Sequence, residues 1–350
     1  MSNNKGLRVG INGFGRIGRS FFRINLKNDY FDIVAVNDVN PDNRNIAYLL
    51  KYDSTYGRLG NSISAVGGCL NVDRKKIKLF HKADIDQAPW QDVGVDVVID
   101  SSGVHKNLLN ALKLKEIGVK YCIVTNSPKE EEVDKIIIMG VNENTLDKKE
   151  DFLISSSICD ANAFCPIANI LEREFGISHG FLTTLHPWLG YQNLLDGPSI
   201  SYATPGEIYD YYALGRSSTV SLIPKTTSAV SASCKVLKQL EGKFLCMSFR
   251  VPTQIVGSGD MSVKLNKDTN TDAIKELFIE EEKKQSLKIF CNHDDGLVSS
   301  DFIASDYSCN IDHRWIMVND RNYLKIVFWY DNEWGYSSRV VDLVNYLGSE

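Results

Sequence analysis

The segment VGINGFGRIGR, residues 9–19, decides the fold of this chain. It starts in a short apolar strand, and its glycines follow the pattern Gly13-x-Gly15-x-x-Gly18 before an amphipathic helical pattern begins. Glycines at these places permit a tight turn and let backbone N–H groups approach a pyrophosphate at the helix N-terminus. A glycine-rich turn without a ligand would share this pattern, so the residues beyond the helix decide between the two interpretations.

A second strand, predicted over residues 33–37, leads directly into Asp38, twenty residues after Gly18. A carboxylate at this distance accepts hydrogen bonds from the adenosine ribose of a dinucleotide. The same carboxylate would repel the 2′-phosphate of NADP, so we predict NAD as the cofactor. The cofactor-binding residues predicted in this unit are Gly13, Phe14, Gly15, Arg16, Ile17 and Asp38.

The rest of the first half of the chain continues to alternate apolar strands with helices. Strands are predicted over residues 95–100, 121–124 and 136–139, a helix over 108–117 and a hairpin within 59–80. Strands this apolar are typical of a buried parallel sheet, and repeated β-α units indicate a doubly wound sheet. Ser102 and Gly103, just after a strand, offer a second place for the backbone to approach the dinucleotide.

Composition narrows the class of protein. The chain has 350 residues, 43% hydrophobic and 24% charged, which fits a globular protein of two domains. The net charge is −5 with both signs interspersed, so we expect no dedicated surface for nucleic acid or an anionic membrane. No apolar run approaches a membrane span of roughly 18–20 residues, and the N-terminal MSNNKG lacks the apolar core of a secretory signal.

The eight cysteines are spread along the chain, and none of them forms a C-x-x-C pair. A zinc site or a disulfide framework usually shows closely spaced cysteines. We therefore predict no metal, mostly structural thiols and a cytoplasmic protein.

The stretch SSSICDANAFCP, residues 155–166, contains the cysteine with the most reactive setting. Cys159 lies between a predicted strand end and a helical pattern. The partial positive charge of a helix N-terminus favours thiolate over thiol. Cysteine is also among the most buried residue types, so this stretch alone leaves open a small buried residue in a tight turn.

Several longer motifs resemble the phosphorylating glyceraldehyde-3-phosphate dehydrogenase family over nearly the whole chain. They are VGINGFGRIGR at 9–19, KYDSTYGRL at 51–59, MGVN at 139–142, TTLH at 183–186, DGPS at 196–199, FRVPT at 249–253, VSSDF at 298–302 and WYDNEWGY at 329–336. The resemblance implies an α/β Rossmann domain with a doubly wound parallel sheet, followed by an α+β catalytic domain with a mostly antiparallel sheet. A C-terminal helix is expected to return to the first domain, and the family is usually a homotetramer. We place the boundaries at residues 1–158, 159–328 and 329–350.

The resemblance also assigns roles in the reaction. The family's nucleophile motif S-C-T-T-N-C-x-x-P corresponds to ICDANAFCP at residues 158–166, so Cys159 carries over as the nucleophile. His186 lies 27 residues further on, at the family spacing for the catalytic base. Asn332 matches the asparagine that orients the nicotinamide, and Tyr336 is expected to pack near it. The resemblance thus implies attack of the cysteine on an aldehyde, transfer of a hydride to NAD and a thioester intermediate.

The residues expected to bind substrate and acceptor depart from the family. Asp160 replaces the threonine that the family uses to bind inorganic phosphate, and a carboxylate there would repel phosphate and raise the thiol pKa. Leu189 and Tyr191 replace two polar positions after His186. The predicted substrate residues are Asp160, Thr227, Ser228 and Arg250, of which Thr227 and Arg250 keep the family's residue type.

Together these patterns predict a divergent member of the superfamily that oxidises a small anionic aldehyde with NAD through a cysteine thioester. Three alternatives remain open from the sequence. The chain could be an ordinary phosphorylating enzyme, an acid-forming variant that hydrolyses the thioester, or a weakly active paralogue with a binding role. The intact Cys159, His186, Asn332 and glycine pattern argue against the last of these.

Overall fold

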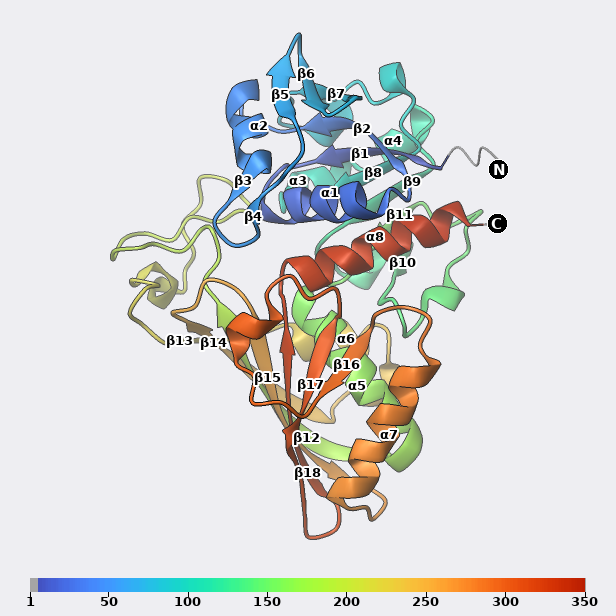
Figure 1. Cartoon of the computed structure of the whole chain (residues 1–350), viewed down its shortest axis with the longest axis vertical. Helices are drawn as coiled ribbons and strands as arrows, with labels where there is room; N and C mark the ends of the chain where they lie inside the picture. Colours follow the sequence, from blue (N-terminus) through green and yellow to red (C-terminus); the bar gives the residue numbers. More distant parts are fainter. Residues whose placement is uncertain (1–5, 350) are drawn as a thin grey trace.

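The computed structural model describes residues 6–349 and contains two large β-sheets, with helix α8 (Trp334–Gly348) lying between them (Figure 1). The nine-stranded sheet forms within residues 8–155 and the seven-stranded sheet within residues 177–330. Most of the stretch on which we predicted the absence of a secretory signal, residues 1–5, lies outside the described residues. None of the helices within residues 6–349 is long and apolar enough to cross a membrane.

The nine-stranded sheet has the order β10-β11-β9-β8-β1-β2-β7-β6-β5. All its pairs are parallel except β5–β6 and β6–β7, which form the predicted hairpin region. Its strands are β1 (Arg8–Asn12), β2 (Asp32–Asn37), β5 (Ile63–Val66), β6 (Cys69–Val72), β7 (Lys75–Phe80), β8 (Val97–Asp100), β9 (Tyr121–Val124), β10 (Lys135–Ile136) and β11 (Leu153–Ser155). Because β2 and β8 flank β1, the chain winds away from β1 in both directions, as a doubly wound fold requires.

The helices and the short hairpin of this half are α1 (Arg16–Asn28), α2 (Asn43–Lys51), α3 (His105–Asn110), α4 (Lys113–Glu116) and the pair β3 (Tyr52–Asp53) and β4 (Gly57–Arg58). Helix α1 buries Phe21, Phe22 and Ile24 against the sheet side of the core, as its amphipathic pattern predicts. Asp42 caps the start of helix α2, because its side chain accepts hydrogen bonds from the backbone N–H groups of the first turn.

Two predicted elements of this half were wrong in detail. The single helix over residues 108–117 is divided into α3 and α4, because the backbone N–H groups of Ala111 and Leu114 bond three residues back rather than four. The strand over residues 136–139 stops at Ile136. The N–H of Ile138 bonds to the Asn142 side chain instead of a neighbouring strand.

The seven-stranded sheet has the order β13-β14-β12-β15-β18-β17-β16 and is mostly antiparallel. Only the pairs β12–β14 and β16–β17 are parallel. Its elements are β12 (Ile177–Pro187), β13 (Ile223–Lys225), β14 (Phe244–Val251), β15 (Gly257–Leu265), β16 (Phe290–His293), β17 (Cys309–Asn319) and β18 (Tyr323–Tyr330), with helices α5 (Cys159–Phe175), α6 (Ala229–Cys234) and α7 (Thr271–Lys284). Helix α5 packs on β15 and β18, and its residues from Asp160 to Ala168 are all buried, so it forms the centre of this half's core.

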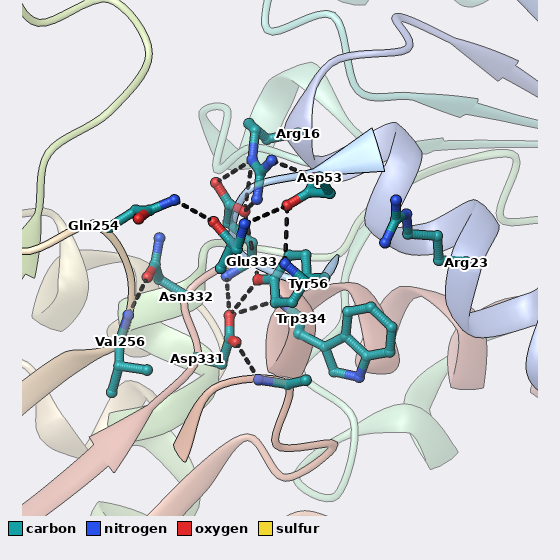
Figure 2. Close-up of polar contacts among 12 residues, drawn as sticks. Arg16, Arg23, Asp53, Tyr56, Gln254, Val256, Asp331, Asn332, Glu333 and Trp334 are labelled. Carbon is teal, nitrogen blue, oxygen red and sulfur yellow. Dashed lines mark hydrogen bonds and ion pairs between the residues drawn. The ribbon is translucent and has the colours of Figure 1, made fainter. Parts of the chain in front are cut away.

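Helix α8 packs along α1 and so returns the end of the chain to the first sheet, as the resemblance implied (Figure 1). Its side chains Val340, Val341, Leu343 and Val344 are fully buried. At its start, a group of polar side chains ties it to the first half of the chain (Figure 2).

Candidate active site

The glycine turn between β1 and α1 has the shape that a dinucleotide requires. Gly13 has φ +86°, and a Cβ there would lie 2.6 Å from the Ser102 backbone. At Gly18 a Cβ would lie 2.3 Å from the Gly13 carbonyl oxygen, so this glycine lets the helix pack closely on the turn. At Gly15 a Cβ would meet nothing within 4 Å. The turn is therefore closely packed on its inner side and open at Gly15, where the backbone faces the cavity described next.

A cavity of about 1190 Å³ extends from this turn to the predicted nucleophile. Both Cys159 and His186 line it. So do nearly all the predicted cofactor residues, namely Gly13, Gly15, Arg16, Ile17, Asp38, Ser102, Gly103, Asn332 and Tyr336. Phe14 is the exception, because its ring is buried against Phe22 and only its backbone N–H takes part in the turn.

Asp38 stands at the end of the cavity where the predicted ribose would bind. One of its carboxylate oxygens accepts the Phe14 N–H at 2.6 Å, and the other accepts the Asn40 N–H at 2.8 Å. These bonds fix the carboxylate at the rim of the glycine turn before any ligand is present. The residues present therefore fit a dinucleotide with an unphosphorylated ribose.

Three buried polar side chains beneath the turn were missed by the sequence analysis. The Asn12 amide donates to Asp100 at 2.9 Å, and the Asn37 amide donates to Asn12 at 2.7 Å. Asn12, Asn37 and Asp100 are the last residues of β1, β2 and β8, whose carboxyl ends lie side by side. Because ligands of doubly wound sheets bind at this edge, the strand ends could have identified them.

Arg16 connects the cofactor cavity to the start of α8, a contact that the sequence analysis also missed (Figure 2). Its guanidinium pairs with Asp53 at 2.5 Å and with Glu333 at 2.6 Å. The Tyr56 hydroxyl donates to Asp331 at 2.9 Å beside them. Burial raises the pKa of Asp331 to about 6, although its carboxylate accepts backbone hydrogen bonds. No short motif reveals these partners, because 317 residues separate Arg16 from Glu333.

Cys159, the predicted nucleophile, follows a strained turn between β11 and α5. Ser157 has φ +59° although it is not glycine, and it is fully buried. Its N–H bonds to the Ser155 hydroxyl at 3.0 Å, and its carbonyl accepts the Tyr336 hydroxyl at 3.0 Å. Tyr336, predicted to lie near the nicotinamide, therefore also fixes the turn that begins α5 at Cys159.

Cys159 and His186 form a close pair. The Cys159 Sγ lies 3.6 Å from the His186 Nε2. The other ring nitrogen, Nδ1, lies 2.7 Å from the Pro187 carbonyl oxygen, which can only accept a hydrogen bond. The carbonyl therefore selects the tautomer with the proton on Nδ1 and the free lone pair on Nε2. Burial, reinforced by Arg250, lowers the pKa of His186 to about 4, so its Nε2 is available to accept a proton at neutral pH.

Asp160 adds a carboxylate to this pair. Its Oδ1 lies 3.5 Å from the Cys159 Sγ and 3.8 Å from the His186 Nε2. Burial and the Asp160 charge raise the pKa of Cys159 well above its ordinary value. The start of α5 was expected to favour the thiolate, but burial and Asp160 outweigh that effect in the free protein. The rise in thiol pKa expected from Asp160 agrees with the structure.

The Asp160 carboxylate is itself bonded on both oxygens. The Tyr330 hydroxyl donates to Oδ1 at 2.8 Å, and the Thr227 hydroxyl donates to Oδ2 at 3.1 Å. Burial alone would raise the pKa of Asp160, but His186, Tyr330 and Arg250 keep it below the ordinary value. With His186 neutral, Tyr330 and Arg250 are the partners that keep the carboxylate ionised in the free protein.

The remaining predicted substrate residues lie around this group but do not line the cavity. Arg250 is buried beside His186, its register partner on the neighbouring strand, and its Nε has no hydrogen-bond partner within the described chain. Its Nη2 is 3.4 Å from the hydroxyl of Tyr191, which does line the cavity. Ser228 is exposed and lies at the N-cap of α6.

Comparison with known sequences identifies the family. Residues 7–108 match the profile described as "Glyceraldehyde 3-phosphate dehydrogenase, NAD binding domain", and residues 158–332 match the corresponding C-terminal domain. The chain belongs to the glyceraldehyde-3-phosphate dehydrogenase family. It is 38% identical over 343 residues to a glyceraldehyde-3-phosphate dehydrogenase of Eremothecium gossypii, with 98% of this chain and 99% of that protein covered. The Geobacillus stearothermophilus enzyme is also 38% identical, over 344 residues and with the same coverage.

Membership of the glyceraldehyde-3-phosphate dehydrogenase family confirms the predicted fold class and NAD as the cofactor of residues 7–108. In this setting Asn332 is held in place at the cavity wall, since its Oδ1 accepts the Val256 N–H at 3.2 Å (Figure 2). That bond leaves the Asn332 amide N–H groups for a ligand carbonyl.

Proposed function

We propose that this protein oxidises a small anionic aldehyde with NAD through a thioester on Cys159. The observation that carries the proposal is the pair of Cys159 Sγ and His186 Nε2, 3.6 Å apart at the wall of the cavity that also contains the glycine turn. A nucleophile, a base and a dinucleotide site thus share one cavity.

The first step follows from the tautomer of His186. As the Cys159 sulfur attacks the aldehyde carbon, its proton passes to the His186 Nε2, whose lone pair faces it. A thiol with a raised pKa needs such a base at the moment of attack, since little thiolate is present beforehand. Asp160 then stabilises the imidazolium from 3.8 Å. When bound, NAD supplies the acceptor for the hydride that leaves the hemithioacetal.

A buried arginine supports an anionic substrate. Arg250 is next to His186 in the sheet register, and its Nε lacks a partner within the described residues. A buried guanidinium group with an N–H that lacks a partner favours an anion that can complete its hydrogen bonds. Because Tyr191 lies between Arg250 and the cavity and touches Nη2, we propose that the substrate anion displaces the Tyr191 hydroxyl. The relatives are named for glyceraldehyde 3-phosphate, which is an aldehyde that carries an anionic group.

A second candidate is an acid-forming enzyme in which water, rather than phosphate, releases the acyl group. The Asp160 carboxylate, 3.5 Å from the Cys159 sulfur, favours it. Inorganic phosphate would approach the thioester against this buried negative charge, whereas water is neutral. Asp160 also accepts a hydrogen bond from the Thr227 hydroxyl. The resemblance assigned that hydroxyl to phosphate binding.

The test is NADH production by the purified chain with a panel of aldehydes, with and without inorganic phosphate. Glyceraldehyde 3-phosphate, related anionic aldehydes and a neutral aldehyde of similar size form the panel, and Cys159→Ala is the control. Product analysis separates an acyl phosphate from a free acid. If the wild type binds NAD but reduces it no faster than Cys159→Ala with every aldehyde, the proposal fails.

We also propose the domain boundaries at residues 1–158, 159–328 and 329–350, with α8 as the returning segment. A homotetramer is proposed from the family resemblance and from the outer face of the second sheet. There Phe181 and Leu245 are register partners that are 58% and 69% exposed, and such paired exposed apolar side chains are typical of an interface. A cytoplasmic location is proposed because all eight cysteines are free, although one relative is chloroplastic.

A further inference from the structure

We propose that Cys159, Asp160 and His186 form a binding site for a thiophilic divalent cation, with Zn²⁺ as the best fit, that covers the nucleophile. Such an ion would bind in the absence of any aldehyde, because its ligands are three side-chain atoms that already lie together.

The three atoms form a nearly regular triangle. The distances are 3.6 Å from Cys159 Sγ to His186 Nε2, 3.5 Å from Sγ to Asp160 Oδ1, and 3.8 Å from Nε2 to Oδ1. A tetrahedral zinc ion with bonds of about 2.0–2.3 Å keeps neighbouring donor atoms roughly 3.3–3.7 Å apart. A few tenths of an ångström of movement by the Asp160 or His186 side chain would therefore complete one face of a zinc site.

Each ligand is already oriented by a further hydrogen bond. The Pro187 carbonyl leaves the lone pair of the His186 Nε2 free for a metal. Tyr330 donates to the ligating oxygen of Asp160, and Thr227 donates to the other. A carboxylate oxygen has two lone pairs, so Oδ1 can keep the Tyr330 bond and also bind the ion. Zinc ligands in proteins typically have such outer partners.

The cluster meets the cavity through two of its three residues. Cys159 and His186 line the cavity of about 1190 Å³, whereas the Asp160 side chain is 8% exposed and does not line it. An ion bound to all three would reach the cavity with its fourth position, which a water molecule can fill. This is the arrangement of an exchangeable zinc site rather than of a closed structural one.

The charges around the site select the ion and limit its affinity. A thiolate, an imidazole and one carboxylate suit Zn²⁺ better than Mg²⁺ or Ca²⁺, which prefer oxygen ligands. On binding, the Cys159 thiol releases its proton to the solvent as the zinc–sulfur bond forms, and nothing is oxidised. The charges of the thiolate and the Asp160 carboxylate then balance the charge of the ion. The positive charges of Arg250 and Lys225 act on the same side chains and oppose cation binding. A chelator should therefore be able to remove the ion.

The sequence analysis missed this site because it searched for closely spaced cysteines. Here one ligand pair is adjacent in sequence at the start of α5, and the third ligand lies on β12, 27 residues from Cys159. Within residues 6–349, Cys159, Asp160 and His186 are the one group of three or more cysteine, histidine or acidic side chains whose ligand atoms lie close enough to share an ion.

The first experiment measures binding directly. The reduced, metal-free full chain is dialysed against zinc chloride, and the metal content is measured before and after EDTA. We expect one zinc per chain, removed by EDTA. Asp160→Asn and Tyr330→Phe should each bind at least about tenfold more weakly, whereas Cys234→Ser, a thiol outside the cavity, should bind as the wild type does.

A second experiment identifies the sulfur ligand. With Co²⁺ in place of zinc, the wild type should show a thiolate-to-cobalt charge-transfer band, and Cys159→Ser should lack it. The band needs only folded wild type, so it remains informative if a variant at Asp160 fails to fold. Equal zinc content in wild type and Cys159→Ser would overturn the proposal, as would a cobalt band that survives in Cys159→Ser. Unchanged affinity in a folded Asp160→Asn would also overturn it.

Discussion

The Thr227 hydroxyl donates a hydrogen bond of 3.1 Å to the Asp160 carboxylate. Two residues at which the family resemblance leads us to expect phosphate ligands therefore bind one another instead. The contact occupies the hydroxyl donor of Thr227. It also holds the negative charge of Asp160 3.5 Å from the Cys159 sulfur.

The first prediction concerns the acceptor. Asp160→Thr removes the charge beside the thioester and frees the Thr227 hydroxyl. We expect the phosphate-dependent rate of NADH formation to rise roughly tenfold or more, which corresponds to about 1.4 kcal/mol in the barrier. The rate is measured against phosphate concentration for both proteins. A flat phosphate dependence in the variant, with no acid formed by the wild type, would contradict our account of this residue.

The second prediction concerns the reactivity of Cys159. Asp160→Asn removes the negative charge that helps to raise the thiol pKa, while keeping a side chain of the same shape. We expect alkylation of Cys159 by iodoacetamide, in the free protein near neutral pH, to become roughly tenfold faster, because a lower thiol pKa leaves more thiolate at that pH. Mass spectrometry of the Cys159 peptide gives the rate, and the Cys234 peptide in the same digest serves as the control. An unchanged or slower rate at Cys159 would be inconsistent with this interpretation.

The third prediction uses the buried Asp331. Its pKa is raised from the ordinary 3.8 to about 6, so between these values the folded state binds a proton that the unfolded state lacks. Stability from this group is therefore fully present below the unfolded pKa and is lost as the pH rises through the folded pKa. The free energy of unfolding of the wild type, minus that of Asp331→Asn, should fall by about 2 kcal/mol between roughly pH 4 and pH 7. Urea unfolding at several pH values measures this difference, and a difference that rises with pH would refute the assignment.

The fourth prediction concerns the link between Arg16 and α8. Arg16→Ala leaves the carboxylates of Asp53 and Glu333, whose side chains are 3% and 12% exposed, without their cation. We expect the free energy of unfolding to fall by roughly 2–3 kcal/mol, somewhat less than for a fully buried pair. Arg216→Ala is the matched control, because its pair with Asp196 is exposed and should contribute less than about 1 kcal/mol. Equal effects of the two substitutions would contradict the prediction.

The fifth prediction concerns assembly. Leu245→Lys places a charge on the exposed apolar face of the second sheet, beside Phe181. If this face joins copies of the chain, light scattering should show a tetramer for the wild type and a smaller species for the variant. Val66→Lys, at an exposed position of the first sheet, is the control and should remain tetrameric. A tetrameric Leu245→Lys would exclude this face as an essential contact.

Much of the fold could be predicted because its signals are local. Gly13, Gly15 and Gly18 could be interpreted as a dinucleotide turn from two nearby features, the strand before them and Asp38 after the next strand. The two errors, at residues 108–117 and 136–139, arose where hydrogen bonds replaced those that the local pattern predicts. At Ile138 the Asn142 side chain takes the place of a strand partner, and no periodicity of apolar residues encodes such a bond.

The candidate site was predicted where spacing along the chain is enough and missed where distant segments meet. The family resemblance pointed to Cys159 and His186 through the family's motif and spacing of 27 residues, and the structure brings the sulfur and the ring nitrogen together. The contacts of Asp160 with Thr227 and Tyr330 span 67 and 170 residues. Such contacts follow from the packing of α5 against the second sheet, so the sequence indicated the charge of Asp160 but not its partners.

The return of α8 to the first sheet has a consequence for synthesis of the chain. The nine-stranded sheet is complete in sequence by Ser155, so its strands can pair while the remaining residues are still being translated. The cavity wall, however, also needs Asn332, Glu333 and Tyr336. A nascent chain stalled anywhere before these residues would therefore contain the glycine turn but not the complete cofactor cavity, and full affinity for NAD would appear only after the ribosome releases the last helix.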